Sequence, residues 1–153
     1  MRGLRAVGRQ CSAVPEEASQ VTPIKEMRVR DFMLTKPVVF TPEMDLLDAV
    51  RILVDRRVSG APVVDERGNL VGILTERDFL RATVVAGYHG EGGGRVGDYM
   101  SSPVQAVNAE DSLLDVAARF VEAKHRSFPV MEDNRVVGLV TRRDVLRVVI
   151  DAF

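Results

Sequence analysis

The first half of the chain changes between strand-like and helix-like spacing of its apolar residues. Residues 38–40 form a short apolar run that predicts a strand, and from residues 42–44 onward the apolar side chains recur as on one face of a helix. Two runs rich in β-branched residues, 61–65 and 70–74, then flank a polar turn, which predicts a pair of antiparallel strands. A second helix is expected from Thr75. This order predicts a β-α-β-β-α unit.

The second half of the chain repeats this order of patterns. Residues 112–123 predict a helix, and the runs at 128–131 and 136–140 predict two strands around turn residues 133–134. A last helix is expected from Thr141. The second half is therefore predicted to form the same β-α-β-β-α unit.

Internal comparison indicates that the two halves are copies of one unit. Met33 and Met100 lie 67 residues apart, and other matching residues keep this spacing. After a gap of one residue, the phrase Gly-Ile-Leu-Thr-Glu-Arg-Asp-Phe-Leu, which starts at Gly72, matches Gly-Leu-Val-Thr-Arg-Arg-Asp-Val-Leu, which starts at Gly138. An ordered series of matches of this kind predicts a tandem repeat.

The repeat divides the chain into a tail, two units and a connecting loop. The units are expected at 27–85 and 95–153, joined by a loop at 86–94 whose glycines do not favour regular structure. A unit of about sixty residues buries too little surface to be stable alone. The two copies are therefore expected to pack sheet face to sheet face in an α+β fold. Residues 1–26 are expected to form a frayed tail or a short helix, in preference to an arginine-rich targeting peptide.

Charge and composition argue against several classes of function. The chain has 21 lysines and arginines against 22 aspartates and glutamates, so no broad charge field favours a nucleic acid or a membrane surface as a partner. The single cysteine, Cys11, cannot form an internal disulfide, which favours a reducing cytoplasm. The two histidines, His89 and His125, are too far apart in sequence to predict a metal cluster. The apolar runs are too short to predict a membrane span.

Three motifs occur in both halves of the chain. They are Val29-Arg-Asp-Phe-Met33 with Val96-Gly-Asp-Tyr-Met100, Ser59-Gly-Ala-Pro-Val-Val-Asp65 with Ser127-Phe-Pro-Val-Met-Glu132, and the two phrases that start at Gly72 and Gly138. In this order the motifs resemble the cystathionine-β-synthase domain pair, also called the CBS pair or Bateman module. The resemblance implies two units related by a pseudo-twofold axis, clefts between them that bind adenine nucleotides or related adenosyl ligands, and association into a homodimer.

The repeated Thr-x-x-Asp sequence has both a binding and a structural interpretation. A carboxylate at Asp78 or Asp144 can accept hydrogen bonds from two neighbouring ribose hydroxyls, and the resemblance favours this role. The hydroxyl of Thr75 or Thr141, together with the amides of the helix start, can hold phosphate. The same residues also form a helix cap, in which Asp replaces the usual Glu. The two roles can coexist.

The predicted nucleotide-binding residues come from both units. The adenine is expected to lie between apolar residues, near Val38 and Ala61-Pro62 in one cleft or near Val104 and Phe128-Pro129 in the other. The second unit offers more positive charge for phosphate, from Lys124-His-Arg126 and Arg142-Arg143, whereas Glu76 opposes phosphate in the first. The alternative for these charged side chains is a solvated face. The full set is Thr35, Val38, Ser59, Ala61, Pro62, Thr75, Arg77, Asp78, Ser102, Val104, His125, Arg126, Ser127, Phe128, Pro129, Thr141, Arg143 and Asp144.

Three functions remain for such a chain. The favoured one is a ligand-sensing regulatory module, in which AMP, ADP, ATP or a relative such as NAD or S-adenosylmethionine changes the state of an unidentified effector protein. A structural homodimerisation module without a ligand is the alternative. An enzyme is disfavoured, because the sequence offers no nucleophile, base or metal cluster for a cleft; Ser59, for example, has no neighbouring histidine.

Overall fold

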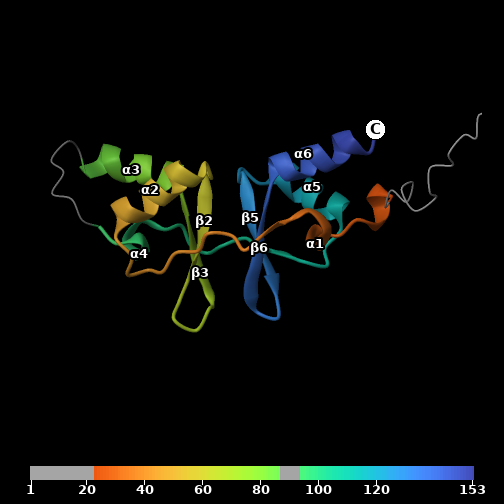
Figure 1. The fold of residues 1–153 in the computed structure, drawn as a ribbon. Helices are drawn as coiled ribbons and strands as arrows, with labels where there is room; N and C mark the ends of the chain where they lie inside the picture. The colour runs from red at the N-terminus through yellow and green to blue at the C-terminus, as the bar shows by residue number, and fades with distance from the viewer. Residues whose placement is uncertain (1–22, 87–93) are drawn as a thin grey trace, which may run out of the picture.

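The computed structural model describes residues 23–86 and 94–153, which form an α+β fold with helices on one side of two β-hairpins (Figure 1). Residues 1–22 and 87–93 lie outside these ranges, and with them most of the predicted tail, most of the predicted loop, Cys11 and His89. Within the described ranges, no helix is both long enough and apolar enough to cross a membrane.

The first unit contains a helix, a hairpin and a second helix, as the pattern predicts. These elements are α2 (Leu46–Arg56), β2 (Gly60–Val64), β3 (Leu70–Thr75) and α3 (Glu76–Ala86). The two strands pair antiparallel. In the turn between them, Asp65 accepts backbone hydrogen bonds from Asn69 and Arg67, each at 2.9 Å. These bonds, above all the one from Asn69, lower the pKa of the Asp65 carboxyl.

The predicted strand at 38–40 reduces to one residue. Phe40 forms a single parallel bridge with Val63, and its ring is buried in the core. Val38 is only partly buried against the core and Val39 is 45% exposed, so Phe40 is the one residue of this run that is fully buried. The prediction of a strand was therefore wrong for 38–40.

Helix α2 begins later than predicted. Asp45 has an extended backbone, and its side chain accepts a hydrogen bond from the backbone N–H of Asp48 at 3.1 Å, which makes Asp45 the N-cap. The first helical residue is therefore Leu46. Residues 42–44, where the helix was predicted to open, lie in the preceding turn.

The second unit has the predicted order as well. Its main elements are α5 (Leu113–Glu122), β5 (Ser127–Glu132), β6 (Arg135–Thr141) and α6 (Arg142–Asp151). A two-residue turn joins β5 to β6, with φ of +50° at Asp133 and +62° at Asn134, which matches the left-handed conformation of a type I′ turn. Strand β4 (Val107–Asn108) runs parallel to β5, in the position that Phe40 takes in the first unit.

Each unit begins with a short segment that packs on the other unit, which the patterns did not predict. The first segment contains α1 (Val29–Phe32) and β1 (Leu34–Thr35), and the second contains α4 (Val96–Tyr99). Strand β1 pairs antiparallel with β6, so the four-stranded sheet has the order β1-β6-β5-β4 and adds one strand of the first repeat to three strands of the second. In return, Ser101, just after α4, pairs with Ile73 of β3.

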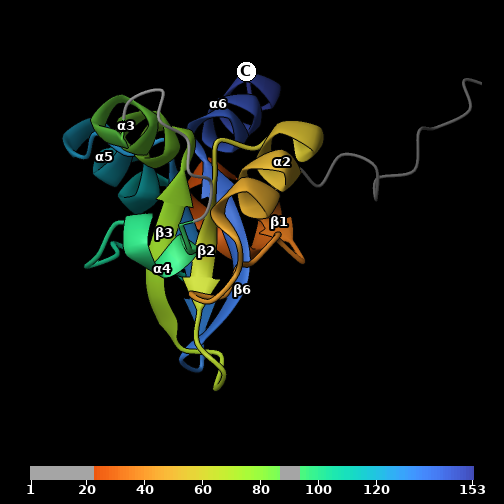
Figure 2. The same ribbon diagram turned by 90° about the vertical axis from the view of Figure 1, so that its left-hand side faces the viewer.

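The two exchanged segments make equivalent contacts, which confirms the pseudo-twofold arrangement. Arg28 bridges to Ser112, and Asp45 bridges to Arg95. Exchanging the repeats converts the first pair into the second, since residue 28 moves forward by 67 to residue 95 and residue 112 moves back by 67 to residue 45. The strands of the two hairpins meet where β2 contacts β5, and Figure 2 shows the long helices α2, α3, α5 and α6 lying together at one end of this pair.

The core has two parts, one in each unit. Helix α2 and the hairpin of the first unit bury Leu53 and Leu74 together with Val96 from the exchanged segment. The second part buries Leu113 and Phe128 around Val29, which comes from the first repeat. Each core is therefore completed by an apolar residue of the other repeat.

Arg30 fastens the first exchanged segment to the second unit. Its guanidinium donates hydrogen bonds to Glu110, with Nε 3.0 Å from Oε1, and to Glu132, with Nη1 3.2 Å from Oε2. The bond from Arg30 lowers the pKa of Glu132, and both carboxylates, Glu132 more than Glu110, raise the pKa of Arg30. All three side chains are well exposed to solvent, which screens this contact.

Candidate functional site

The first Thr-x-x-Asp sequence forms a closed hydrogen-bonded ring at the start of α3. The backbone N–H and the hydroxyl of Thr75 both donate to Oδ2 of Asp78, at 2.9 and 3.0 Å. The N–H of Asp78 donates back to Oγ1 of Thr75 at 3.2 Å. Each residue thus satisfies the other, as in a capping box. Thr75 and Asp78 therefore form the helix cap that the structural interpretation predicts.

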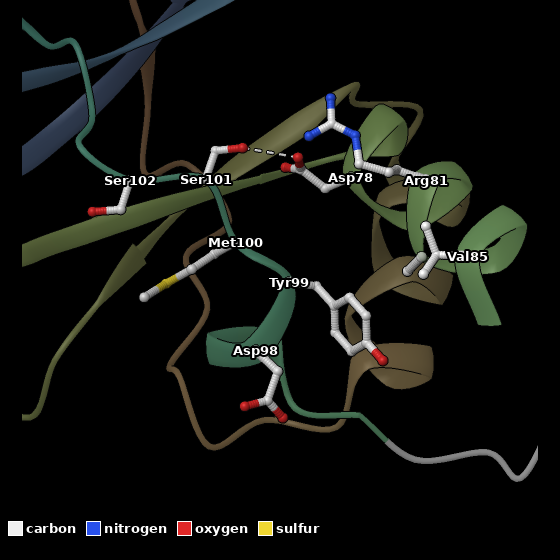
Figure 3. Close-up of a pocket in the computed structure, with 9 residues that line it drawn as sticks. Asp78, Arg81, Val85, Asp98, Tyr99, Met100, Ser101 and Ser102 are labelled. Atoms are coloured by element: carbon white, nitrogen blue, oxygen red, sulfur yellow. Dashed lines mark hydrogen bonds between the residues drawn. The ribbon is translucent and has the colours of Figure 1, made fainter.

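The remaining oxygen of Asp78 is held by a residue of the other repeat. Oγ of Ser101 donates a hydrogen bond to Oδ1 of Asp78 at 2.8 Å (Figure 3). Backbone pairing sets the position of Ser101, because its N–H donates to the Ile73 carbonyl at 2.9 Å and its carbonyl accepts from the Ile73 N–H at 3.0 Å. Asp78 is only 7% exposed. Its carboxylate is therefore both buried and largely occupied.

A hollow of about 430 Å³ opens beside this carboxylate, between α3 and the segment that begins with α4 (Figure 3). Of the predicted binding residues, it brings together Asp78 and Ser102. Sequence reasoning did not select its other lining residues, although three of them, Asp98, Tyr99 and Met100, belong to the repeated motif that begins at Val96. These other residues are Arg81, Ala82, Val85, Asp98, Tyr99, Met100 and Ser101.

The second Thr-x-x-Asp sequence has the same cap but fewer hydrogen bonds. The N–H of Thr141 donates to Oδ2 of Asp144 at 2.9 Å, and the N–H of Asp144 donates to Oγ1 of Thr141 at 3.2 Å. Among the described residues, none donates to Oδ1 of Asp144, and none accepts from the hydroxyl of Thr141. Asp144 is also partly exposed. Both polar groups therefore retain capacity for a ligand.

Strand β1 brings a predicted residue from the first repeat close to this second sequence. Thr35 pairs with Gly138, and Leu34 pairs with Leu139, two residues before Thr141. Leu34 is the residue that corresponds to Ser101 under the spacing of 67. Its side chain carries no hydrogen-bond donor and is 48% exposed. The second site therefore lacks the contact that occupies Asp78.

Several residues predicted to enclose adenine lie in the core instead. Phe128 is 0% exposed, and its ring packs on Phe120 with 4.6 Å between the centroids. Ala61 is also buried, as are Pro62 and Pro129. Their place in β2 and β5 explains the burial, because these strands run between the two cores. Ser127, at the start of β5, is 6% exposed. None of these side chains lines the hollow beside Asp78 or a second hollow beside Val38.

Val38 and Val104 remain available to solvent in part. Val38 lines a second hollow of about 410 Å³, which is bounded by residues 36–39 and by Ile52, Asp55 and Arg56 of α2. No other predicted binding residue lines this hollow. The geometry therefore links Val38 to α2, and not to either carboxylate.

The predicted phosphate-binding side chains are all on the surface. His125 and Arg126 are exposed before β5, and Arg77 and Arg143 are exposed at the starts of α3 and α6. His125 also lies with its ring edge toward Phe128, 5.9 Å between centroids. None of these four side chains forms a salt bridge within the described ranges. They are therefore free to meet an anion at the surface.

At each Thr-x-x-Asp sequence, the first backbone amide of the helix already donates a hydrogen bond to a carbonyl of the same repeat. The carbonyl of Ser59 accepts from the N–H of Glu76 at 2.9 Å, and the carbonyl of Arg126 accepts from the N–H of Arg142 at 3.1 Å. Ser59 and Arg126 are thus equivalent positions, and their backbones contribute to the helix starts. In the described part of the chain, no group of His, Cys, Asp and Glu is arranged to hold a metal ion.

Comparison with known proteins gives consistent matches to both repeats. The family model described as CBS domain matches residues 29–84 and 96–151. The crystal structure of CBSX2 in complex with AMP is 30% identical, with a TM-score of 0.70, and the match covers 81% of this chain and 96% of that chain. CBSX2 is a protein of Arabidopsis thaliana.

Two further relatives differ in the share of their length that is matched. The CBS domain pair of protein MJ0100, solved with 5′-methylthioadenosine and S-adenosyl-L-methionine, is 26% identical with a TM-score of 0.73, over 83% of this chain and 98% of that chain. Inosine-5′-monophosphate dehydrogenase of Staphylococcus aureus is 31% identical over 142 residues, which are 89% of this chain but 27% of that protein. Among the first curated relatives it matches, the chain spans between 14% and 57% of their length.

Proposed function

Because the chain belongs to the CBS domain family and carries that domain twice, we propose that it is a regulatory module that senses an adenosine-containing ligand. The ligand is AMP, ADP, ATP or a relative such as S-adenosylmethionine, and it binds in clefts where the two repeats meet. Binding then alters the state of an effector protein. The observation that carries this proposal is that two similar solved domain pairs hold adenosine compounds, AMP in one and 5′-methylthioadenosine with S-adenosyl-L-methionine in the other.

The chemistry of the second Thr-x-x-Asp sequence supports the ribose part of this proposal. A vicinal diol offers two donors, and a carboxylate that accepts from both discriminates ribose from ligands without that pair. Asp144 has an oxygen without a partner among the described residues, and Thr141 has a free hydroxyl proton beside it. The exposed side chains of His125, Arg126 and Arg143 supply positive charge for phosphate from the same repeat.

Regulation follows from the way the repeats are joined. Each exchanged segment belongs to one repeat and pairs with the strand that leads to the Thr-x-x-Asp sequence of the other. A ligand held between Asp144 and β1 therefore contacts both repeats, and it favours the arrangement in which it binds more tightly. A partner that recognises that arrangement senses the ligand. This role requires no catalytic group, and in the dehydrogenase relative the matched region is a fraction of the protein.

A homodimer is part of the proposal, because the helices present an apolar surface. The four long helices lie on one side of the molecule (Figure 1), and their exposed apolar residues recur at equivalent positions of the two repeats. These residues are Leu47, Val54, Leu80, Val84, Leu114, Val121, Leu146 and Ile150, which we call the helix face. An apolar surface of this kind marks a contact with another molecule. Its internal pseudo-symmetry fits a second copy of the chain. We expect the dimer in a reducing compartment such as the cytoplasm.

A homodimerisation module without a ligand is the second candidate, and the helix face is the observation that favours it. The two candidates differ in one measurable property. A ligand that binds only the folded state raises the melting temperature with its concentration, whereas a module that only dimerises does not respond to nucleotides.

A thermal-shift screen distinguishes these candidates. The full chain is heated with AMP, ADP, ATP, NAD or S-adenosylmethionine, and with GTP as a control that shares the ribose and phosphates but not the adenine. We expect one or more adenine compounds to raise the melting temperature and GTP to raise it less. If none of them raises it at millimolar concentration, the sensing function is wrong and the dimerisation module remains.

A further inference from the structure

The two Thr-x-x-Asp sequences are equivalent in the repeat but not in their hydrogen bonds. We propose that Ser101 occupies Asp78 in competition with the ribose of the ligand, so that the cleft at Asp144 binds an adenosine compound more tightly than the cleft at Asp78. Ser101 is then a specificity-determining residue that separates the affinities of the two clefts. The inference rests on the proposed function, since it concerns which cleft the adenosine ligand fills.

The positions compared are related by the repeat. Ser101 follows Met100 and pairs with Ile73 of β3, which leads to Thr75 and Asp78. In the other repeat, Leu34 follows Met33 and pairs with Leu139 of β6, which leads to Thr141 and Asp144. The equivalent backbone pairings therefore place a serine before one Thr-x-x-Asp sequence and a leucine before the other.

At Asp78 three hydrogen bonds are already made. Oδ2 accepts from the N–H and the hydroxyl of Thr75, at 2.9 and 3.0 Å, and Oδ1 accepts from Ser101 at 2.8 Å (Figure 3). A carboxylate has about four lone-pair sites, so one is left. A ribose that binds through two hydroxyls must first displace Ser101, whose hydroxyl is then left to find another partner. Binding at Asp78 therefore exchanges one charge-assisted hydrogen bond for another.

At Asp144 no such exchange is needed. Oδ2 accepts one bond from Thr141, at 2.9 Å, and Oδ1 has no donor among the described residues. Leu34 has no polar atom in its side chain, so the group that a ribose displaces at Oδ1 comes from solvent. The hydroxyl of Thr141 donates to none of the described residues, whereas that of Thr75 already donates a hydrogen bond to Asp78. Both differences favour a ligand at Asp144.

The charges around the two carboxylates act in the same direction. The second repeat places Arg142 next to Arg143 at the start of α6, whereas α3 begins with Glu76 next to Arg77. All four side chains are exposed, so their effect on a phosphate is moderate and depends on salt. The Asp144 cleft should therefore bind AMP more tightly than the Asp78 cleft, and this difference in affinity should increase as phosphates are added to the ligand.

Neither test substitution removes a buried group that the fold depends on. The pairing of Ser101 with Ile73 uses backbone atoms only, so Ser101→Ala keeps it. The side chain of Leu34 is 48% exposed, so Leu34→Ser removes little buried area. The two variants form a matched pair: the first frees Asp78, and the second gives Asp144 the hydroxyl that Asp78 has.

The experiment is calorimetric titration of the full chain with AMP, for the unchanged protein and for Ser101→Ala, Leu34→Ser, Asp144→Asn and Asp78→Asn. We expect two binding steps, with the tighter one lost in Asp144→Asn and kept in Asp78→Asn. Ser101→Ala should strengthen the weaker step roughly tenfold, and Leu34→Ser should weaken the tighter step by a similar factor.

The outcomes separate the two levels of the proposal. Two equal steps in the unchanged protein, a tighter step lost in Asp78→Asn, or a weaker step that Ser101→Ala leaves unchanged or weakens further would each overturn the role of Ser101 while adenosine binding stands. Absence of heat with AMP in every protein, repeated with S-adenosylmethionine, would overturn the sensing function itself and the inference with it.

Discussion

The sulfur of Met33 lies directly over Gly138, so that a methyl group added to the glycine would come within 2.6 Å of the sulfur and 2.8 Å of the Leu34 carbonyl oxygen. Gly72 stands in the same relation to Met100, whose Cγ would lie 2.9 Å from the added carbon. The glycine that opens each repeated phrase lies inside a strand, and it leaves room for the segment of the other repeat to cross. In both copies of the phrase, the first glycine therefore lies where the segment of the other repeat packs against the strand.

The closeness of these contacts leads to a prediction about stability. We expect Gly138→Ala to lower the free energy of unfolding by about 1–3 kcal/mol, since the new carbon meets a backbone oxygen that can move only with β1. Gly72→Ala should cost less, because the three atoms nearest to the new carbon all belong to the flexible side chain of Met100. Urea denaturation measures both values.

Removing the methionine provides the control for that comparison. In a double-mutant cycle, Met100→Ala should relieve most of the cost of Gly72→Ala, whereas Met33→Ala should relieve only part of the cost of Gly138→Ala, because the Leu34 oxygen remains. Equal relief in both cycles would mean that the backbone oxygen is not the obstacle.

Local patterns were sufficient to predict the hairpins and the long helices. Continuous apolar runs and the turn at 133–134 predict β5 and β6, and the spacing of 67 residues shows that the same unit occurs twice. The exchange of segments was not predictable in this way. Spacing tells which face of Val29-Arg-Asp-Phe-Met33 is apolar, but not which of two similar cores it enters.

In the candidate site, too, sequence predicted the contacts between neighbouring residues and missed those that depend on the exchanged segment. The caps at Thr75 and Thr141 are local, so sequence reasoning found them. Ser101 was missed because its contact with Asp78 depends on the crossing segment, 23 residues away in the chain. Phe128 was predicted to lie beside adenine as an apolar residue, and the strand that carries it turns its ring into the core against Phe120.

The contact of Arg30 with Glu132 makes one part of the stability depend on pH. The hydrogen bond from Arg30 lowers the pKa of Glu132 below its ordinary value of 4.5. The unfolded chain then binds more protons than the folded one, so the contact stabilises fully above about pH 4.5 and is lost as pH falls through the lowered pKa. We expect the difference in melting temperature between the unchanged protein and Arg30→Ala to shrink over that range.

A surface pair provides the comparison for Arg30. Arg51 lies 3.8 Å from Asp48 on α2, and both side chains are far more exposed than Arg30. Arg51→Ala should change the melting temperature little at any pH. If Arg30→Ala behaved like Arg51→Ala, with a small effect that does not vary between pH 3 and 7, the contact across the repeats would contribute nothing measurable.

The helix face predicts the oligomeric state. Leu80 and Leu146 occupy equivalent positions on α3 and α6 and are 62% and 59% exposed. Replacing both with Glu places charges in the proposed interface, which should shift the protein from dimer to a monomer of 16.9 kDa in sedimentation experiments. Val39→Glu, at an exposed apolar residue outside the helices, should leave the dimer intact. A double variant that sediments like the unchanged protein would assign the helix face to another partner.

The basic side chains predict how affinity changes with the number of phosphates. Arg143 and Arg77 occupy equivalent second positions of α6 and α3, and both are exposed. We expect Arg143→Ala to weaken ATP binding more than adenosine binding, by roughly threefold to tenfold at low salt and less at 0.5 M salt. Arg77→Ala should have a smaller effect on the tighter step, because Arg77 lies on α3 with Asp78 and not at the Asp144 cleft. Equal losses for ATP and adenosine would show that Arg143 does not meet the phosphates.

Asp144→Ala separates ribose binding from helix capping. The substitution removes the acceptor of the Thr141 N–H, so it should lower the free energy of unfolding by about 1 kcal/mol, as the loss of a cap does. It should also weaken AMP binding roughly tenfold or more, because a charged acceptor for the ribose is lost. Ser112→Ala is the matched control, since Oγ of Ser112 caps α5 by accepting from the Asp115 N–H at 3.1 Å. It should cost similar stability and leave the affinity unchanged. If Asp144→Ala gave the same result as Ser112→Ala, the repeated phrase would be a helix cap alone, and the ligand would have to be held elsewhere.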